Sequence, residues 1–168
     1  MSASTEHLLI PKIENGIVID HIPAGSGVRI LEILRADPKL SAAITTLGLN
    51  YSSRKLGRKD MIKLWVEELP PQVLQHISMI CRGVTIKSIK RFGVEKKLFL
   101  SVPESIVGQA RCKNPTCITN HERDVITRFF MTDPSSNEFK CAHCEQVAPL
   151  SELEIVVPWP DRRRKKRG

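Results

Sequence analysis

Two close pairs of cysteines in the C-terminal part of this chain constrain its fold more than any other feature. Four residues separate Cys112 from Cys117, two separate Cys141 from Cys144, and about 20 residues lie between the pairs. Each pair forms a knuckle short enough for both sulfur atoms to reach one ion, and two knuckles complete a tetrahedral thiolate site. Four unrelated cysteines are the alternative, because free cysteine often packs as a small apolar residue. The spacing favours one zinc ion per chain.

We expect this zinc to be structural. A catalytic zinc usually keeps one coordination position for water, and four thiolates leave no such position. His121 and His143 are competing ligand candidates, but the four-cysteine set is complete without them. The metal would supply folding energy to a segment too small to build a large core. The fifth cysteine, Cys81, continues the apolar face of a predicted helix and is expected to be a core residue.

The chain before the cysteines shows strand and helix signals in the order βαββαβ. Apolar and β-branched runs indicate the strands, while Ser26 and the Pro70-Pro71 pair indicate helix starts. The predicted strands cover residues 17–20, 42–50, 60–68 and 84–92, with 94–101 as an extension, and the predicted helices cover 26–36 and a stretch from 70 onward. This order is typical of a ferredoxin-like sheet covered on one face by two helices.

Periodicity assigns some side chains to faces of these elements. In the first helix, Val28, Leu31 and Leu34 recur every three residues and are expected to face the core. The third predicted strand alternates, with Ile62, Leu64 and Val66 on one face and Met61, Lys63 and Trp65 on the other.

The predicted fold class is therefore α+β, with two domains and a tail. Residues 1–101 form the ferredoxin-like domain, 102–158 a small, mostly-β zinc-binding domain, and 159–168 a basic tail. Six basic residues at 162–167 dominate the charge, because without them the net charge falls from +8 to +2. A terminal basic run is more often a solvated tail than a specific nucleic-acid site. The folded body is thus nearly balanced in charge.

Several classes of protein are disfavoured by the sequence. No apolar run approaches the ~20 residues of a membrane span, and the N-terminus lacks the pattern of a signal peptide. We therefore expect a cytoplasmic protein, in which disulfides are disfavoured. No Walker loop, GxSxG or HExxH motif occurs, and no pairing of nucleophile and base stands out.

A carboxylate and an imidazole stand side by side in the stretch GIVIDHIPAG. Asp20 and His21 could form a catalytic pair, but neighbouring strand residues point to opposite faces, so a polar strand end is the simpler interpretation. Lysines on or beside the same sheet indicate an anion site for a nucleoside triphosphate, although edge lysines also block pairing between sheets. These lysines are Lys59, Lys63, Lys87, Lys96 and Lys97.

Taken together, GIVIDHIPAG, GLN, GRKDMIK, LPPQV and the four-cysteine array resemble the regulatory chains of aspartate carbamoyltransferase. The resemblance covers about residues 8–150. It implies an N-terminal allosteric domain that binds CTP or ATP, and a C-terminal zinc domain that docks on the catalytic chain. It also implies a regulatory-chain homodimer in de novo pyrimidine biosynthesis, without catalytic activity of its own.

The resemblance also implies roles for individual residues. Asp20 would bind the ribose, His21 and Lys97 the phosphates, and Lys63 the region of the ribose and base. Further effector-site positions are Ile10, Ile13 and Val18 around the base, Val94 beside the phosphate lysine, and Lys87. Asn50 and Lys59 match positions near a second nucleotide or metal site, and Asn114 and Glu145 match positions that face the catalytic chain. Lys87 replaces an amide found in relatives, Pro11 an acid and Phe92 a tyrosine.

A zinc-ribbon protein that binds nucleic acid is the alternative function. The zinc pattern and the basic tail support it. Such a protein would need aromatic side chains for base stacking, and aromatics make up only 5% of the chain. The sequence therefore favours the regulatory chain and makes nucleic-acid binding an unlikely role.

Overall fold

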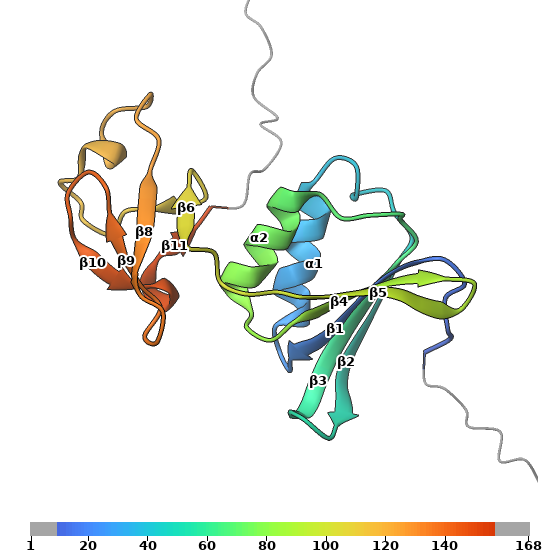
Figure 1. Cartoon of the computed structure of the whole chain (residues 1–168). Helices are drawn as coiled ribbons and strands as arrows, with labels where there is room; N and C mark the ends of the chain where they lie inside the picture. Colours follow the sequence, from blue (N-terminus) through green and yellow to red (C-terminus); the bar gives the residue numbers. More distant parts are fainter. Residues whose placement is uncertain (1–9, 157–168) are drawn as a thin grey trace, which may run out of the picture.

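The computed structural model describes residues 10–156, which form two domains side by side (Figure 1). The predicted basic tail at 159–168 lies outside the described residues. The first domain comprises β1 (Gly16–Pro23), α1 (Gly27–Ala36), β2 (Thr45–Ser53), β3 (Gly57–Leu64), α2 (Pro71–Ile80), β4 (Thr85–Lys90) and β5 (Gly93–Phe99). The second comprises β6 (Ser105–Val107), β7 (Ala110–Arg111), β8 (Arg128–Asp133), β9 (Glu138–Cys141), β10 (Val147–Pro149) and β11 (Glu154–Ile155), with 3-10 turns at Ile118–Asn120 and Leu150–Glu152.

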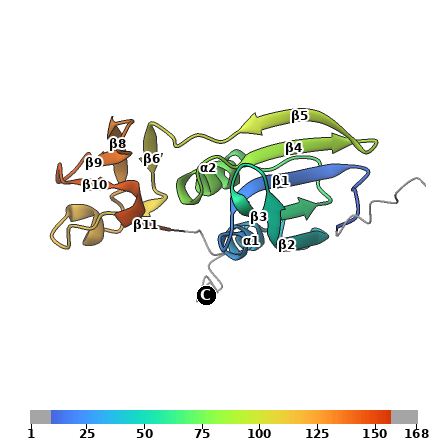
Figure 2. The same ribbon diagram turned by 90° about the horizontal axis from the view of Figure 1, so that it is seen from below.

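The first domain is an antiparallel sheet in the order β2-β3-β1-β4-β5 (Figure 2). The first four strands in this order have the predicted ferredoxin-like arrangement, and β5 adds an edge strand beside β4. The α+β fold class is thus confirmed. Strand ends differ from the prediction, because β3 begins at Gly57 and already ends at Leu64. No helix within residues 10–156 has the length and apolar character needed to cross a bilayer.

Both helices pack on one face of the sheet, and we call the other face the open face. The core between helices and sheet contains Ile30, Ile33 and Leu34 of α1 together with Ile19 and Ile62 of the sheet. The prediction that Val28 faces this core was wrong, since its side chain is 47% exposed. The prediction holds for Leu34, which is buried, and Leu31 packs partly buried against the same core.

A β-bulge in β1 decides which side chains reach the open face. Ile19 pairs with Ile62 of β3, but the next pair joins Ile22 to Asp60, so Asp20 and His21 together oppose one residue. His21 adopts a left-handed backbone conformation, with φ of 59°. The extra residue keeps Ile19 and Ile22 both fully buried in the core although they are three positions apart. Asp20 is thereby left on the open face.

A buried carboxylate holds the start of α1. Ser26 occupies the predicted N-cap position, but its side chain makes no capping hydrogen bond. Instead, Asp60 of β3, which is fully buried, accepts hydrogen bonds from the backbone N–H groups of Gly25 and Gly27 at 2.9 Å each. Its second oxygen accepts the N–H of Asn50 at 2.9 Å. The carboxylate therefore satisfies free donors at the positive end of the helix.

The second domain has its own core around a four-stranded sheet in the order β10-β9-β8-β6. Phe129, Phe139 and Ile106 are buried there beside the cysteines. Met79 of α2 belongs to the same core, so one helix of the first domain contributes to both cores. Cys81, at the end of α2, is buried in the first core as predicted.

We predict that Asp60→Ala lowers the free energy of unfolding by about 3 kcal/mol or more, because it leaves three backbone donors without their charged acceptor. Urea unfolding followed by circular dichroism measures this loss. Asp37→Ala is the matched control, since this carboxylate accepts one exposed N–H, from Lys39, at the other end of the helix. The control should cost no more than about 1 kcal/mol. Equal losses in the two variants would contradict the capping role of Asp60.

Candidate metal centre and effector site

The four predicted cysteine ligands come together in the second domain. The sulfur atoms of Cys112, Cys117, Cys141 and Cys144 all lie within 4.8 Å of one another. The Cys112–Cys144 separation is 3.6 Å and the Cys117–Cys141 separation is 3.9 Å. Tetrahedral zinc with Zn–S bonds of about 2.3 Å places its sulfurs about 3.8 Å apart. The donor set and its dimensions therefore fit one structural zinc ion per chain.

Backbone hydrogen bonds shape both knuckles. In the first, the N–H of Cys117 donates to the carbonyl of Asn114 at 3.0 Å, and the side chain of Asn120 donates to the carbonyls of Cys112 and Asn114. In the second, the N–H of Glu145 donates to the carbonyl of Cys141 at 3.0 Å, with Glu145 in a left-handed conformation. These bonds hold the backbone of both knuckles around the sulfur atoms.

The local environment alters how readily the thiols ionise. Burial raises the pKa of Cys112 to about 12 and also raises the pKa of Cys141. Burial opposes ionisation of Cys144 as well, but hydrogen bonds, first that of the Gln146 N–H, lower its pKa to about 7. Zinc needs thiolates, so metal binding at neutral pH must displace protons.

The two histidines near the cysteines are not part of the metal-ligating cluster. The Nε2 atom of His121 lies 2.7 Å from the carbonyl oxygen of Pro115, and that of His143 lies 3.0 Å from the carbonyl oxygen of Ile126. The four-sulfur cluster contains neither histidine. Both rings therefore support loops around the centre.

The lysines of the first domain meet on the open face of the sheet. Cross-strand pairing joins Thr46 to Lys63, Lys63 to Val18, Val18 to Lys87, and Lys87 to Lys97. Residues paired in this way point to the same face, so the row carries one side chain from each strand. Lys96 pairs with Ser88 and points to the helix face. Three of the lysines predicted for an anion site, Lys63, Lys87 and Lys97, therefore share one face of the sheet.

Asp20 is the centre of a charge cluster beside this row, two residues along β1 from Val18. Its carboxylate is 4% exposed and lies 2.6 Å from Nζ of Lys59 and 2.5 Å from Nζ of Lys87. The backbone N–H of His21 donates to the same carboxylate at 2.7 Å. Burial opposes ionisation, but the two lysines outweigh it and hold the pKa of Asp20 well below its usual range. Lys59, assigned to a second site from sequence, therefore lies in this cluster.

The ring of His21 lies against Asp20, contrary to the expectation that the pair points to opposite faces. Its Nδ1 atom is 3.7 Å from the carboxylate of Asp20, because the bulge breaks the strand alternation. Burial lowers the pKa of His21, although Asp20 favours the charged form. Within the described residues, Nδ1 is buried and has no hydrogen-bond partner. A buried polar atom of this kind is unusual in a native protein and indicates a place for a ligand group.

Lys63 is the most enclosed of the predicted effector-site lysines. It is 8% exposed, and its ammonium group donates to the carbonyl oxygen of Pro11 at 2.5 Å. Burial lowers its pKa. The main chain at Pro11 therefore supplies the acceptor for this ammonium group.

Apolar side chains form the remaining part of the open face. Ile13, Val18 and Ile89 form a small buried cluster with Met61 packed against it. Val94 pairs with Ile89 and is 51% exposed. Ile89 and Met61 were missed as site residues, although the strand alternation that places Lys87 and Lys63 on this face also places them there.

Ile10 borders this apolar cluster from the side of β2, because Gly48 beneath it pairs with Met61. The side chains of Ile10 and Tyr51 lie over Gly48, in the space that a side chain at position 48 would occupy. Asn50 sits in the β2 bulge, where its N–H binds Asp60. The structure therefore brings Lys59 but not Asn50 to the cluster around Asp20.

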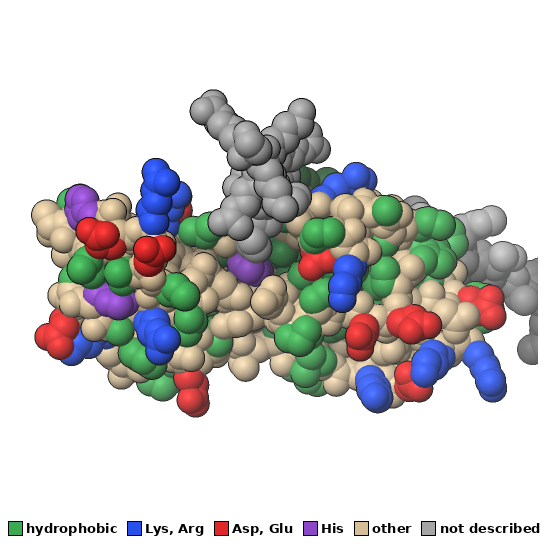
Figure 3. Space-filling view, turned by 90° about the horizontal axis from the view of Figure 1, so that it is seen from above, with side chains coloured by type: hydrophobic (Ala, Val, Ile, Leu, Met, Phe, Trp, Pro, Cys, Tyr) green, Lys and Arg blue, Asp and Glu red, His purple; other side chains and the backbone are tan. Residues whose placement is uncertain are grey.

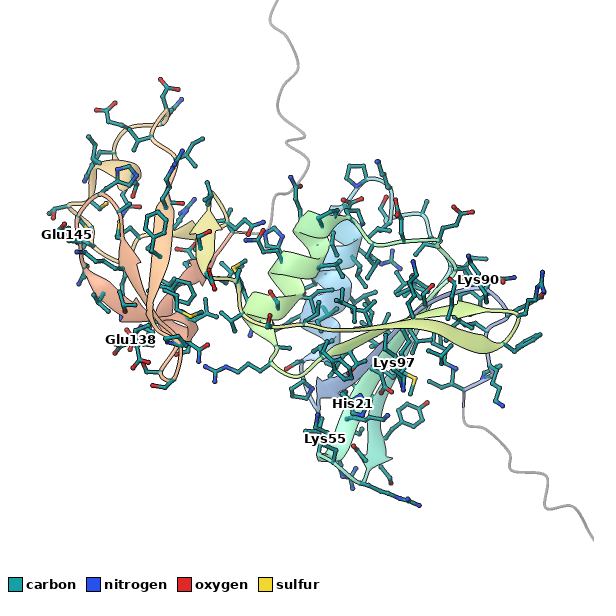
Figure 4. The ribbon with its side chains drawn as sticks, viewed as in Figure 1. His21, Lys55, Lys90, Lys97, Glu138 and Glu145 are labelled. Atoms are coloured by element: carbon teal, nitrogen blue, oxygen red, sulfur yellow. The ribbon has the colours of Figure 1, made fainter. Side chains whose placement is uncertain are left out.

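The two predicted docking residues flank the metal centre. The side-chain oxygen of Asn114 accepts the N–H and the hydroxyl of Thr116 at 3.0 and 2.8 Å, so it also supports its own knuckle. Glu145 is exposed and lies 3.4 Å from the ammonium of Lys140. Figure 4 places Glu145 at the outer end of the second domain, far from His21 and Lys97 in the first.

The sequence matches two family models that together cover most of the chain. Residues 8–101 match the aspartate carbamoyltransferase regulatory chain, allosteric domain, and residues 104–154 match the metal binding domain of the same chain.

Curated relatives carry the name aspartate carbamoyltransferase regulatory chain. The relative from Pyrobaculum arsenaticum is 40% identical over 150 residues, which are 89% of this chain and 99% of the relative. The one from Thermofilum pendens is 41% identical over 152 residues, covering 90% and 94% of the two chains. The one from Pyrococcus abyssi is 36% identical over 150 residues, covering 89% and 97%. The zinc-ribbon alternative is not favoured by these matches.

We predict that Cys141→Ser abolishes stoichiometric zinc binding and unfolds the second domain, because Cys141 is fully buried and supplies one of four ligands. Zinc analysis and NMR spectra of the purified chain measure both effects. Cys81→Ser is the control, since it removes a buried thiol outside the cluster and should keep the zinc. A Cys141→Ser protein with full zinc content would refute the four-thiolate site.

Proposed function

The chain belongs to the family of aspartate carbamoyltransferase regulatory chains, and from that premise we propose that it binds the nucleotide effectors CTP and ATP in its first domain and signals to a catalytic chain through its zinc domain. As a regulatory chain it is the non-catalytic subunit of the transferase. The observation that carries the effector-binding part is the cluster of Asp20, Lys59, Lys87 and His21, in which a buried ring nitrogen has no partner within residues 10–156.

The open face offers separate places for the parts of a nucleotide. Lys97 and Lys87 supply ammonium groups for phosphates, and His21 supplies the unpartnered nitrogen beside them. Asp20 would accept a ribose hydroxyl. Lys63 would lie next to the ribose, since it pairs with Val18, two residues before Asp20. The base would pack against Ile13, Val18 and Val94, with Ile10 at the margin. Phosphates carry several charges, so one carboxylate among four lysines leaves a net attraction.

The second domain would bind the catalytic chain at the outer side of the metal centre. Asn114 and Glu145 stand on backbone fixed by the zinc knuckles, which makes them rigid contacts. The outer face of the adjacent sheet adds apolar surface, because Phe130 is 52% and Val147 is 47% exposed. Lys140 lies between these two in the cross-strand row and gives the patch a charged centre.

We further propose that two regulatory chains pair through β5. Every side chain of this edge strand is exposed, including Val94, Leu98 and Phe99, the last at 71%. An open edge with apolar side chains favours pairing with another strand. None of the five cysteines forms a disulfide, which agrees with the proposed cytoplasmic location. Viewed from above, acidic and basic side chains are intermixed on the visible surface (Figure 3), which offers nucleic acid no continuous basic groove on this side.

We predict that Lys97→Ala weakens CTP and ATP binding roughly tenfold or more, because a charge-assisted hydrogen bond to phosphate contributes about 1.5–3 kcal/mol. Isothermal titration calorimetry on the isolated chain measures the affinity. Lys96→Ala is the matched control, since Lys96 is the neighbouring lysine on the opposite face of β5. It should bind nucleotide like the parent. Equal effects of the two substitutions would move the effector site away from the open face.

We predict that the double substitution Asn114→Ala and Glu145→Ala leaves zinc content and CTP affinity unchanged but weakens assembly with the catalytic chain and its response to nucleotide. Carbamoyltransferase activity against nucleotide concentration and the mass of the reconstituted complex are the measurements. Glu138→Ala is the control, because Glu138 lies at the other end of β9 from the metal centre (Figure 4). A double variant that assembles and responds like the parent would refute this docking surface.

A further inference from the structure

Three polar contacts join the two domains within residues 10–156. Two of them end on main-chain carbonyl oxygens of the second domain, where Gln75 contacts Ser105 at 3.4 Å and His76 contacts Val156 at 3.1 Å. The third joins one side chain from each domain: Arg82, which follows α2, and Asn137, which directly precedes β9. Neither the metal centre nor the effector site uses these two residues.

The guanidinium of Arg82 donates two hydrogen bonds to the side chain of Asn137. A guanidinium can only donate, so the amide atom that faces it is the oxygen. This oxygen lies 2.5 Å from Nη2 and 3.0 Å from Nη1 of Arg82. Asn137 is 7% exposed, so the arginine and not bulk water is the partner of this buried oxygen. Because two N–H groups of a rigid planar fork meet one oxygen, the contact fixes direction as well as distance.

The backbone of each domain sets the starting point of this contact. Gly83, which follows Arg82, has φ of 73°, and the chain turns there from α2 into β4. Asn137 has φ of 52°, a left-handed conformation that asparagine adopts more readily than most residues. Its carbonyl oxygen accepts the N–H of Leu150 at 3.0 Å, which ties it to the chain after β10. Each side chain therefore reports the position of its own domain.

A cleft of about 1020 Å³ lies between the domains beside this contact. Arg82, Leu100 and Ser101 line it from the first domain, and Phe130, Met131 and Asn137 line it from the second. Phe130 is 52% exposed, so the side chains of the two domains are not packed together along this side. Domains without a large apolar interface are expected to move relative to one another. On the side of the cleft, the contact between Arg82 and Asn137 is therefore what holds the domains at their angle.

The pair also lies between the effector site and the metal centre. Strand β4, which begins shortly after Arg82, carries Lys87, whose ammonium group is bound to Asp20. Strand β9, which begins at the residue after Asn137, ends at the zinc ligand Cys141. An effector that draws Lys87 away from Asp20 would act on the strand that starts beside Arg82.

We propose that Arg82 and Asn137 are a positioning pair, which holds the second domain at one orientation to the first and thereby transmits effector binding toward the metal centre. Neither residue contacts the nucleotide or the metal, so both act through the orientation of the domains. The transmission rests on the proposed function, whereas the fixed orientation does not.

The first test measures residual dipolar couplings of the zinc-loaded, ¹⁵N-labelled full chain. In the parent, the couplings of both domains should fit one alignment tensor. In Arg82→Ala, each domain should still fit on its own, but the two should differ in the magnitude of alignment, because they move independently. Arg35→Ala, which removes an exposed arginine at the end of α1, is the matched control and should behave like the parent. An Arg82→Ala chain whose domains share one tensor overturns the proposal.

Two variants of Asn137 separate its side chain from its backbone conformation. Asn137→Gly keeps the left-handed backbone without strain and removes the acceptor, so its domains should move independently, as in Arg82→Ala. Asn137→Asp keeps an acceptor and tolerates the same conformation, so its domains should share one tensor. An Asn137→Gly chain that behaves like the parent overturns the pair. If Asn137→Gly does not fold, Arg82→Ala, which removes an exposed side chain, decides the question.

The second test measures carbamoyltransferase activity of the complex reconstituted with the catalytic chain, with and without CTP. Arg82→Ala should bind CTP within about twofold of the parent, because Arg82 lies outside the effector site. The factor by which CTP changes the activity should nevertheless fall roughly twofold or more, and Asn137→Asp should retain it. A parent-like response in the Arg82→Ala complex overturns the transmission. A parent that does not respond to nucleotide contradicts the proposed function instead, and the dipolar couplings still decide whether the pair fixes the orientation.

Discussion

The register of the antiparallel strands in the first domain decides on which face of the sheet each charged strand residue lies. Each strand presents alternate residues to the two faces, and the helices cover only one face. The row that contains Lys63, Lys87 and Lys97 therefore depends on β3, β1, β4 and β5 keeping their pairing. A slip of one residue in β3 or β4 would bury Lys63 or Lys87 under the helices, which is energetically costly. The same apolar core that stabilises the domain thus also orders the polar face.

Much of this arrangement could be predicted from the sequence, because it depends on local patterns. The alternation of apolar and polar residues in β3 correctly places Ile62 and Leu64 on one face and Lys63 on the other. The order of strands and helices correctly indicates the ferredoxin-like core. The four cysteines could be grouped because spacing within a knuckle is a local property. To this grouping the structure adds the distances between the sulfur atoms, which suit zinc.

What could not be predicted depends on contacts between distant parts of the chain. The bulge in β1 appears only through its pairing with β3, and it brings His21 onto Asp20 against the expectation from strand alternation. The role of Asp60 arises because a strand residue lies below the start of a helix that ends 24 positions earlier in the chain, at Ala36. Lys59 reaches Asp20 across 39 residues. Such contacts leave no short motif, so a single sequence cannot reveal them.

Because α2 packs in both cores, loss of the metal from the second domain would affect the stability of the whole polypeptide. Met79 is covered only while the zinc-held domain keeps its shape around it. Withdrawal of the ion would remove this cover and expose an apolar side of α2 to the solvent, even though the rest of the first domain remained intact. A cell short of zinc would then accumulate chains that chaperones and proteases recognise. The supply of the metal would thereby set how many regulatory chains survive to be assembled.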